Sequence, residues 1–111
     1  MSEEFLRDSE TLLQQGGYRS SVDRAYYSIH YCVLAMLDAQ GVRPPRSHRG
    51  LVNLFGARIV NPGLVEKEFA DILSEALRYR SLGTYDRDAV ITREDAEETV
   101  SNARRFLSRA Q

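Results

Sequence analysis

Residues 18–40, which read YRSSVDRAYYSIHYCVLAMLDAQ, decide the fold because they form one long helical pattern that is apolar on more than one side. Apolar side chains recur there every three or four positions, the spacing of one helix face: Val22, Ala25, Tyr26, Ile29, Val33, Met36 and Leu37. An apolar flank widens that face: Tyr27, Tyr31 and Leu34. A helix that is apolar around most of its surface is usually central in a bundle or buried against a second subunit.

Four further segments show helical periodicity, and none shows the alternation of a strand. We expect these helices over residues 2–15, 47–60, 62–82 and 92–110. Ser2 is expected to cap the helix over residues 2–15, and Pro62 is expected to occupy the first turn of the helix over residues 62–82, the fourth along the chain. Gly83 is expected to end that helix, and Thr92 with Asp95 forms a capping pair for the last. The sequence therefore predicts an all-α antiparallel bundle of four long helices plus one short helix.

Composition sets limits on domain number, location and partners. With 111 residues, of which 42% are apolar and 28% charged, the chain is expected to form one soluble domain. A net charge of −1 argues against electrostatic binding of nucleic acid or membrane by the molecule as a whole, so any such contact must come from a local basic patch. No apolar run approaches the roughly 20 residues that span a bilayer, and residues 1–4 lack a signal-peptide core. A lone Cys32 among apolar neighbours is expected to be a buried thiol, so we expect a cytoplasmic protein.

Four local patterns narrow the class further. The stretch RAYYSIHY occupies residues 24–31, and SHRGL occupies residues 47–51, with Phe55 four residues beyond. The stretch RYRSLGTYD occupies residues 78–86. The last predicted helix contributes Thr92, Ala96, Ala103 and Phe106. In this order the patterns resemble the HEPN family, specifically its short stand-alone prokaryotic branch.

The resemblance covers nearly the whole chain and carries expectations about assembly and activity. It implies a single helical domain over residues 1–111 that forms a homodimer through the helix bearing the Arg-rich element. It also implies frequent pairing with a minimal nucleotidyltransferase encoded nearby. Members of the family act as nucleotide-binding modules or as metal-independent ribonucleases, often in toxin–antitoxin or defence systems. We therefore expect no metal and no cofactor.

The ribonuclease members of the family use an arginine followed, after four to six residues, by a histidine, commonly with a tyrosine two residues beyond. Arg78 matches the arginine and Tyr85 the tyrosine, whereas the histidine position falls on Gly83; Arg80 matches a second arginine of many members. Arginine can hold a phosphate bidentately and histidine can move protons near neutral pH, but glycine can do neither. The pattern leaves catalysis open and favours a binding module.

Arg78, Arg80 and Tyr85 are thus candidate site residues, with a structural alternative. The two arginines would complement the carboxyl end of their helix, and Tyr85 would pack its ring. Arginines two residues apart leave a helix about 200° apart, so both should not face one ligand unless a dimer or a frayed end helps. We expect Arg80, the nearer to the helix end, to point into a cleft.

A second candidate group lies at the start of the 47–60 helix. Arg46, His48 and Arg49 form the most basic local cluster, and helix N-termini bind anions readily. The alternative is a solvated loop in which Ser47 caps the helix.

Three interpretations concern the central helix itself. Arg24 lies within its apolar stretch, where an unpaired charge is costly, so we expect a partner in Asp71, Glu75 or a phosphate. His30 is expected to be a satisfied buried or interface residue. The aromatic side chains could stack on bases, although core or dimer-interface positions are the alternative; they are Tyr26, Tyr27 and Tyr31.

Three functional hypotheses follow. The first is a homodimeric nucleotide- or RNA-binding module that partners a minimal nucleotidyltransferase, with Arg24, Arg78, Arg80, Tyr85 and the 46–49 cluster as ligand-binding candidates. The second is a divergent metal-independent ribonuclease, with Arg78, Arg80, Tyr85 and His48 as catalytic candidates and either His48 or Tyr85 carrying the proton. The third is a non-catalytic interaction bundle whose apolar surface binds a different chain.

Overall fold

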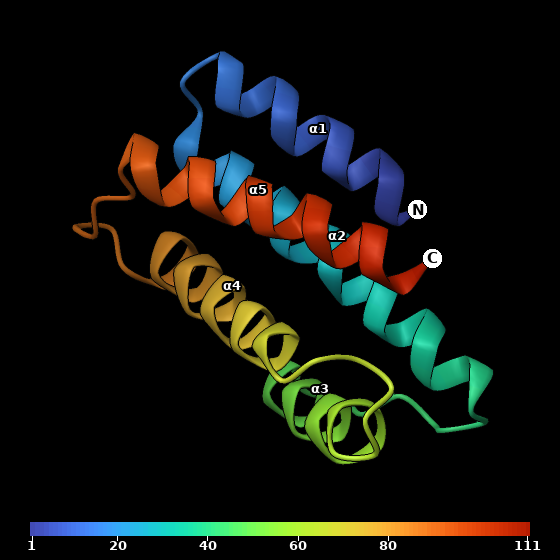
Figure 1. Ribbon diagram of the computed structural model, residues 1–111. Helices are drawn as coiled ribbons and strands as arrows, with labels where there is room; N and C mark the ends of the chain where they lie inside the picture. Colours follow the sequence, from blue (N-terminus) through green and yellow to red (C-terminus); the bar gives the residue numbers. More distant parts are fainter.

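The computed structural model describes residues 1–111 and contains helices but no strands (Figure 1). The elements are α1 (Ser2–Gln14), α2 (Tyr18–Ala39), α3 (His48–Phe55), the short π-helical turn η1 (Gly56–Val60), α4 (Glu68–Tyr85) and α5 (Arg93–Ala110). Helices α1 and α4 run in one direction, and α2 and α5 run in the other (Figure 1). This confirms the all-α bundle of four long helices plus one short helix.

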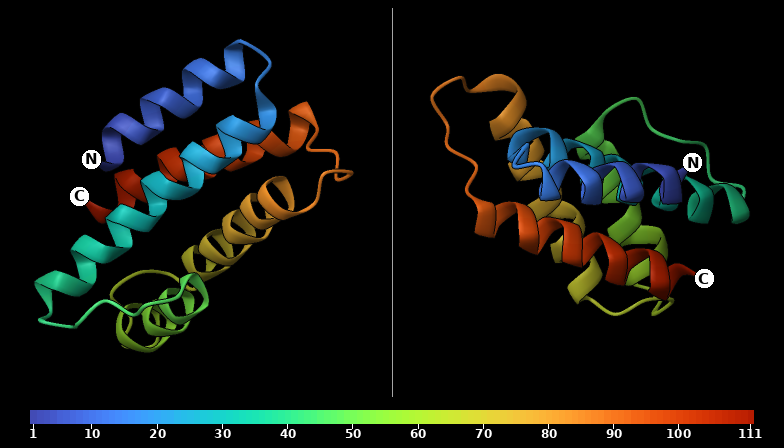
Figure 2. Two further views of the ribbon diagram at one scale, coloured as in Figure 1. Left: turned by 180° about the vertical axis from the view of Figure 1, so that it is seen from behind. Right: turned by 90° about the horizontal axis from the view of Figure 1, so that it is seen from above.

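Helix α2 is the centre of the bundle, as its sequence predicts. It contacts α1, α3, η1, α4 and α5. Figure 2 shows α1 and α5 lying along it, with α4 and α3 on another side. Its Tyr26 is fully buried, at 0% exposure, although it carries a polar hydroxyl. The long apolar face of α2 thus organises the whole core.

An aromatic contact chain fixes α3 and α4, the two helices that carry most of the predicted site residues. The rings of Phe55 and Phe106 have centroids 5.5 Å apart, and those of Phe69 and Phe106 have centroids 5.7 Å apart in an edge-on arrangement. All three side chains belong to one continuous buried cluster. Since aromatic pairs of this geometry stabilise a fold by more than their buried area alone, these contacts hold α3, α4 and α5 in fixed positions relative to one another.

Two caps form as expected. Ser47 precedes α3, and its Oγ accepts a hydrogen bond from the backbone N–H of Gly50 at 2.9 Å. Thr92 and Asp95 form a reciprocal capping box at the start of α5, with both bonds at 3.1 Å. Ser2, in contrast, is the first residue within α1 and provides no side-chain cap, because Met1 occupies the preceding position.

The expectation that Pro62 opens the fourth helix is wrong. Residues 61–64 instead close the preceding helix: the backbone N–H of Leu64 bonds to the carbonyl of Ile59 at 3.0 Å, and Gly63 has φ +86°. This is the left-handed glycine closure typical of helix C-termini. Helix α4 therefore begins only at Glu68.

The expectation that Gly83 ends the fourth helix is also wrong, since α4 continues to Tyr85. Glycine costs a helix about 1 kcal/mol relative to alanine, but a tertiary contact outweighs this preference. The carbonyl oxygen of Gly83 accepts a hydrogen bond of 2.8 Å from Nη1 of Arg19 at the start of α2.

No helix in the bundle combines the length and the apolar character that a membrane span requires.

Candidate functional site

A cleft of about 710 Å³ lies where the second half of α4 faces the start of α3. Its lining brings together five residues that the sequence singles out from two distant segments: His48, Arg49, Arg78, Arg80 and Tyr85. Two carboxylates, Glu75 and Asp86, also line it. Three arginines thus face two carboxylates across a lining that also includes Leu77, Leu82 and the exposed Tyr85.

Arg80 is the most deeply placed charge of the cleft, with a side chain only 13% exposed. Its Nη2 donates to the hydroxyl of Tyr27 at 3.1 Å, and its guanidinium lies 5.5 Å from the centroid of that ring. Nε lies 3.5 Å from Oδ1 of Asp23, too far for a good hydrogen bond, and this buried N–H has no hydrogen-bond partner. Asp23 is therefore an ion-pair partner of Arg80, and the only hydrogen bond that the guanidinium donates within the protein is the one to Tyr27, so its terminal N–H groups can still donate to an anion in the cleft.

Arg78 stands at the rim and not in the interior. Its side chain is 55% exposed, forms an ion pair with Glu75 and stacks over the ring of Tyr79, 4.6 Å from the centroid. Exposed pairs of this kind contribute little to stability, so Arg78 can exchange its partner at small cost. Although Arg78 and Arg80 leave α4 on different faces, their long side chains both reach the same cleft.

A cluster of imidazole and phenol groups adjoins Arg80. The hydroxyl of Tyr26 lies 2.6 Å from Nδ1 of His48 and 3.4 Å from Nδ1 of His30. The two imidazole rings have centroids 5.2 Å apart, and we call them the histidine pair. No local pattern in the sequence links His30 to His48, because the contact joins α2 to the start of α3.

Burial and the charge of Arg80 keep the histidine pair neutral at neutral pH. Burial, then His48 and Arg80, lowers the pKa of His30 from its ordinary 6.5 to about 4. Burial and Arg80 also lower the pKa of His48. Burial raises the pKa of Tyr26 far above its ordinary range, so its phenol stays protonated and can donate to Nδ1 of His48. We assign the proton of His48 to Nε2 on this basis.

The remaining members of the predicted basic cluster flank His48. Arg49 is exposed and lines the cleft, whereas Arg46 is exposed and lines a neighbouring pocket that also contacts His48. Ser47 caps α3, as expected in the alternative interpretation of this cluster. The capped helix start thus fixes His48 between two basic side chains.

Arg24 does not belong to the cleft, and the expectation of an ion pair with Asp71 or Glu75 is wrong. Its side chain is exposed and lies over the ring of Phe5, with Cζ 5.5 Å from the centroid. Glu75 pairs with Arg78 instead. Arg24 needs no buried partner because it occupies the solvent-facing side of α2, beside α1.

Arg19 supports the cleft without lining it. Its guanidinium donates to four main-chain carbonyls: Nη1 to Gly83 at 2.8 Å and Asp86 at 3.2 Å, and Nη2 to Arg87 at 3.1 Å and to Ala89. These bonds tie the segment that follows α4 to the start of α2. Arg19 therefore positions the end of α4, where the cleft residues Tyr85 and Asp86 lie. Sequence reasoning missed it, since its partners lie 64 to 70 residues away.

Gly83, where the resemblance would place a histidine, does not line the cleft. A Cβ built on Gly83 would lie 3.9 Å from Cβ and Cγ of Arg19 and 4.0 Å from Cγ1 of Ile91. A side chain at this position would thus grow toward the start of α2. The one histidine that lines the cleft is His48, from the start of α3.

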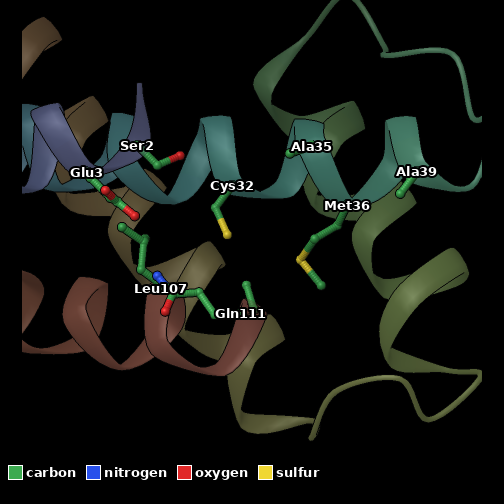
Figure 3. A pocket seen from close by; sticks show the side chains of 9 residues that line it. Ser2, Glu3, Cys32, Ala35, Met36, Ala39, Leu107 and Gln111 are labelled. Carbon is green, nitrogen blue, oxygen red and sulfur yellow. The ribbon is translucent and has the colours of Figure 1, made fainter.

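A second cavity, of about 350 Å³, lies at the other end of α2, near both chain termini (Figure 3). Cys32 and Met36 direct their sulfur atoms toward it, and Leu107 and Gln111 border it from α5 and the C-terminus (Figure 3). Cys32 is a buried free thiol, as expected, and burial raises its pKa to about 11. This cavity has no basic lining residue, so it offers nothing to a phosphate.

Nowhere in the structure do three or more His, Cys, Asp or Glu side chains gather in a group that could hold a metal ion.

The fold and the cleft define a small helical-bundle domain in which arginine, histidine and tyrosine side chains meet beside the third helix. A family model described as the HEPN domain matches residues 1–111. The chain therefore belongs to the HEPN family.

Similar proteins occur in archaea. The chain is 30% identical over 110 residues to "Putative toxin MJ0142" of Methanocaldococcus jannaschii, a match that covers 99% of this chain and 74% of that one. It is 31% identical over 109 residues to "Putative toxin MJ0605" of the same organism, covering 98% and 80% respectively. It is 37% identical over 76 residues to UPF0332 protein PH1297 of Pyrococcus horikoshii, covering 68% and 53%.

Proposed function

We propose that the chain is a toxin-like HEPN module whose cleft binds the phosphate groups of RNA or of a nucleotide. The observation that carries the proposal is Arg80, whose side chain lines the cleft at 13% exposure and whose guanidinium donates only one hydrogen bond within the protein, to Tyr27. The names of the two similar proteins of M. jannaschii support the toxin-like part.

A phosphate group suits the arginines that line this cleft. Arginine presents a planar fork of donors that matches two phosphate oxygens, and the basic Arg49 and Arg78 stand close to Arg80 along the same lining. The neutral His48, which lines the cleft, adds an Nε2–H donor without further charge. Glu75 neutralises Arg78 only through an exposed pair, which an incoming phosphate can replace.

The direct test is to titrate ATP and a short single-stranded RNA into the wild-type protein and the Arg80→Ala variant. Charge-assisted hydrogen bonds contribute about 1.5–3 kcal/mol, so Arg80→Ala should weaken binding at least about tenfold. Arg93→Ala is the matched control, because Arg93 is exposed, pairs with Glu97 and lies outside the cleft. Circular dichroism checks that each variant is folded. Equal affinity of wild type and Arg80→Ala, or no binding of either ligand, contradicts the proposal.

A second candidate function is a metal-independent ribonuclease, and the presence of His48 in the same cleft as Arg80 favours it. In such a reaction the RNA 2′-oxygen attacks the adjacent phosphorus and the bond to the 5′-oxygen breaks, while His48 or Tyr85 carries the 2′-hydroxyl proton to the departing 5′-oxygen and Arg80 stabilises the phosphorane charge. His48 can take that proton on Nε2 only in its Nδ1–H tautomer, in which the hydroxyl of Tyr26 accepts instead of donating. Incubating labelled RNA with the purified protein in EDTA, and measuring cleavage, distinguishes a ribonuclease from a protein that only binds RNA. Cleavage that disappears in His48→Ala or Tyr85→Phe supports it, and intact RNA retires it for the RNAs tested.

We further propose that the module works as a homodimer and partners a minimal nucleotidyltransferase. Tyr85 is 76% exposed at the edge of the cleft, which leaves apolar surface there for a second chain. Light scattering on the protein alone and after mixing with the nucleotidyltransferase tests both parts. A stable complex formed by a protein that binds neither RNA nor ATP points instead to the third hypothesis, an interaction bundle.

A further inference from the structure

The pocket that Arg46 lines, of about 340 Å³, adjoins the cleft, and His48 lines both. Tyr27, His30 and Leu34 line it from α2, and the connection between α2 and α3 closes it on the other side. Tyr27 also accepts the hydrogen bond from Arg80, which lines the cleft. The pocket and the cleft are therefore joined through two shared contacts.

One wall of this pocket is aromatic. The rings of Tyr27 and His30 meet edge to face, with centroids 5.5 Å apart, and both are half-buried. Nδ1 of both imidazoles faces the hydroxyl of Tyr26, which can donate its single proton to only one of them, and neither Nε2 makes a hydrogen bond within the protein. This wall therefore offers aromatic surface together with imidazole nitrogens that lack partners.

The opposite wall consists of Pro44 and Pro45, and close packing holds it in place. A Cβ added to Gly50 would lie 2.9 Å from Oγ of Ser47 and 3.0 Å from Cβ of Pro45. Only glycine at this position lets the connection approach α3 so closely. Since proline also fixes its own φ angle, the wall is expected to be rigid.

We propose that this pocket holds an unpaired nucleobase of single-stranded RNA whose neighbouring phosphate lies in the cleft. The proposal rests on the proposed function and names its substrate class. A base fits between an aromatic wall and a proline wall, where stacking contributes about 1–3 kcal/mol per base. Imidazole nitrogens can bond to the base edge. A base within a duplex is stacked and paired and cannot enter such a pocket, so single strands are selected.

The test compares the affinities of hexaribonucleotides of A, C or U, an abasic hexamer with the same backbone, and a duplex. Wild type should bind at least one homopolymer about tenfold more tightly than the abasic hexamer and the duplex. Leu34→Trp should fill the pocket, because Leu34 lines it but does not line the cleft. This variant should bind that homopolymer and the abasic hexamer equally, at the affinity of wild type for the abasic hexamer.

The outcomes separate this proposal from the proposed function. Equal affinity of wild type for the abasic and base-carrying hexamers overturns the base pocket but leaves phosphate binding intact. No binding of any oligonucleotide overturns both. Should Leu34→Trp fail to fold, ultraviolet crosslinking of 4-thiouridine RNA to wild type replaces it. A crosslink mapped to residues 27–34 or 44–48 supports the pocket, and crosslinks confined to other residues overturn it.

Discussion

Replacing Tyr26 with alanine is expected to lower the free energy of unfolding by about 3–5 kcal/mol, the usual range for deleting a fully buried aromatic ring. Tyr26 is 0% exposed in the middle of α2, the helix that contacts every other element. Its loss leaves a cavity at the centre of the bundle, which the packed helices can only partly fill. Urea unfolding monitored by circular dichroism measures the change.

Tyr26→Phe is the matched variant because it keeps the ring and removes only the hydroxyl. It should cost about 1–2 kcal/mol, since Nδ1 of His48 loses its partner at 2.6 Å. The pair of variants therefore separates the core role of the ring from the site role of the hydroxyl. Equal losses in the two variants would show that the ring contributes nothing beyond its hydroxyl, contrary to the packing described above. An unchanged midpoint in Tyr26→Phe would show that the bond to His48 is weak.

The helices were predictable from sequence because their apolar faces repeat over many residues. The helix ends were less so. Pro62 fits either the start of one helix or the close of another, and only the hydrogen bond from Leu64 to Ile59 decides between them. Gly83 similarly remains helical because Arg19, distant in the sequence, binds its carbonyl. Local propensity is a weak guide wherever a tertiary contact acts on the same residue.

The candidate site was predictable only in part, for the same physical reason. The basic residues near His48 and the Arg-rich end of α4 stand out as short local patterns, and the structure brings them to one cleft. The burial of Arg80 and the approach of His30 to His48 depend on how α2, α3 and α4 pack together. Arg24 shows the converse error, because an apolar stretch of sequence does not say which side of a central helix remains open to solvent.

Acid should destabilise the fold through His30. Its pKa is lowered from 6.5 to about 4 in the folded protein, so between these values the unfolded chain binds a proton that the folded chain does not. The free energy of unfolding therefore falls as the pH drops from about 6.5 to about 4, and the full contribution is present only above 6.5. Because the ring is only half-buried, we discount the shift for solvent screening and expect a loss of about 2 kcal/mol.

His30→Gln isolates this effect, since glutamine keeps hydrogen-bonding groups but does not titrate. Urea unfolding of both proteins at pH 7 and pH 4.5 should give a larger loss for wild type than for the variant. Other groups also lose stability in acid, including Asp95, whose pKa is lowered by hydrogen bonds at the start of α5. Those contributions, and that of His48, are present in both proteins and largely cancel in the difference. Parallel losses would mean that His30 is solvated and titrates normally, which would remove the physical basis for a neutral histidine pair beside Arg80.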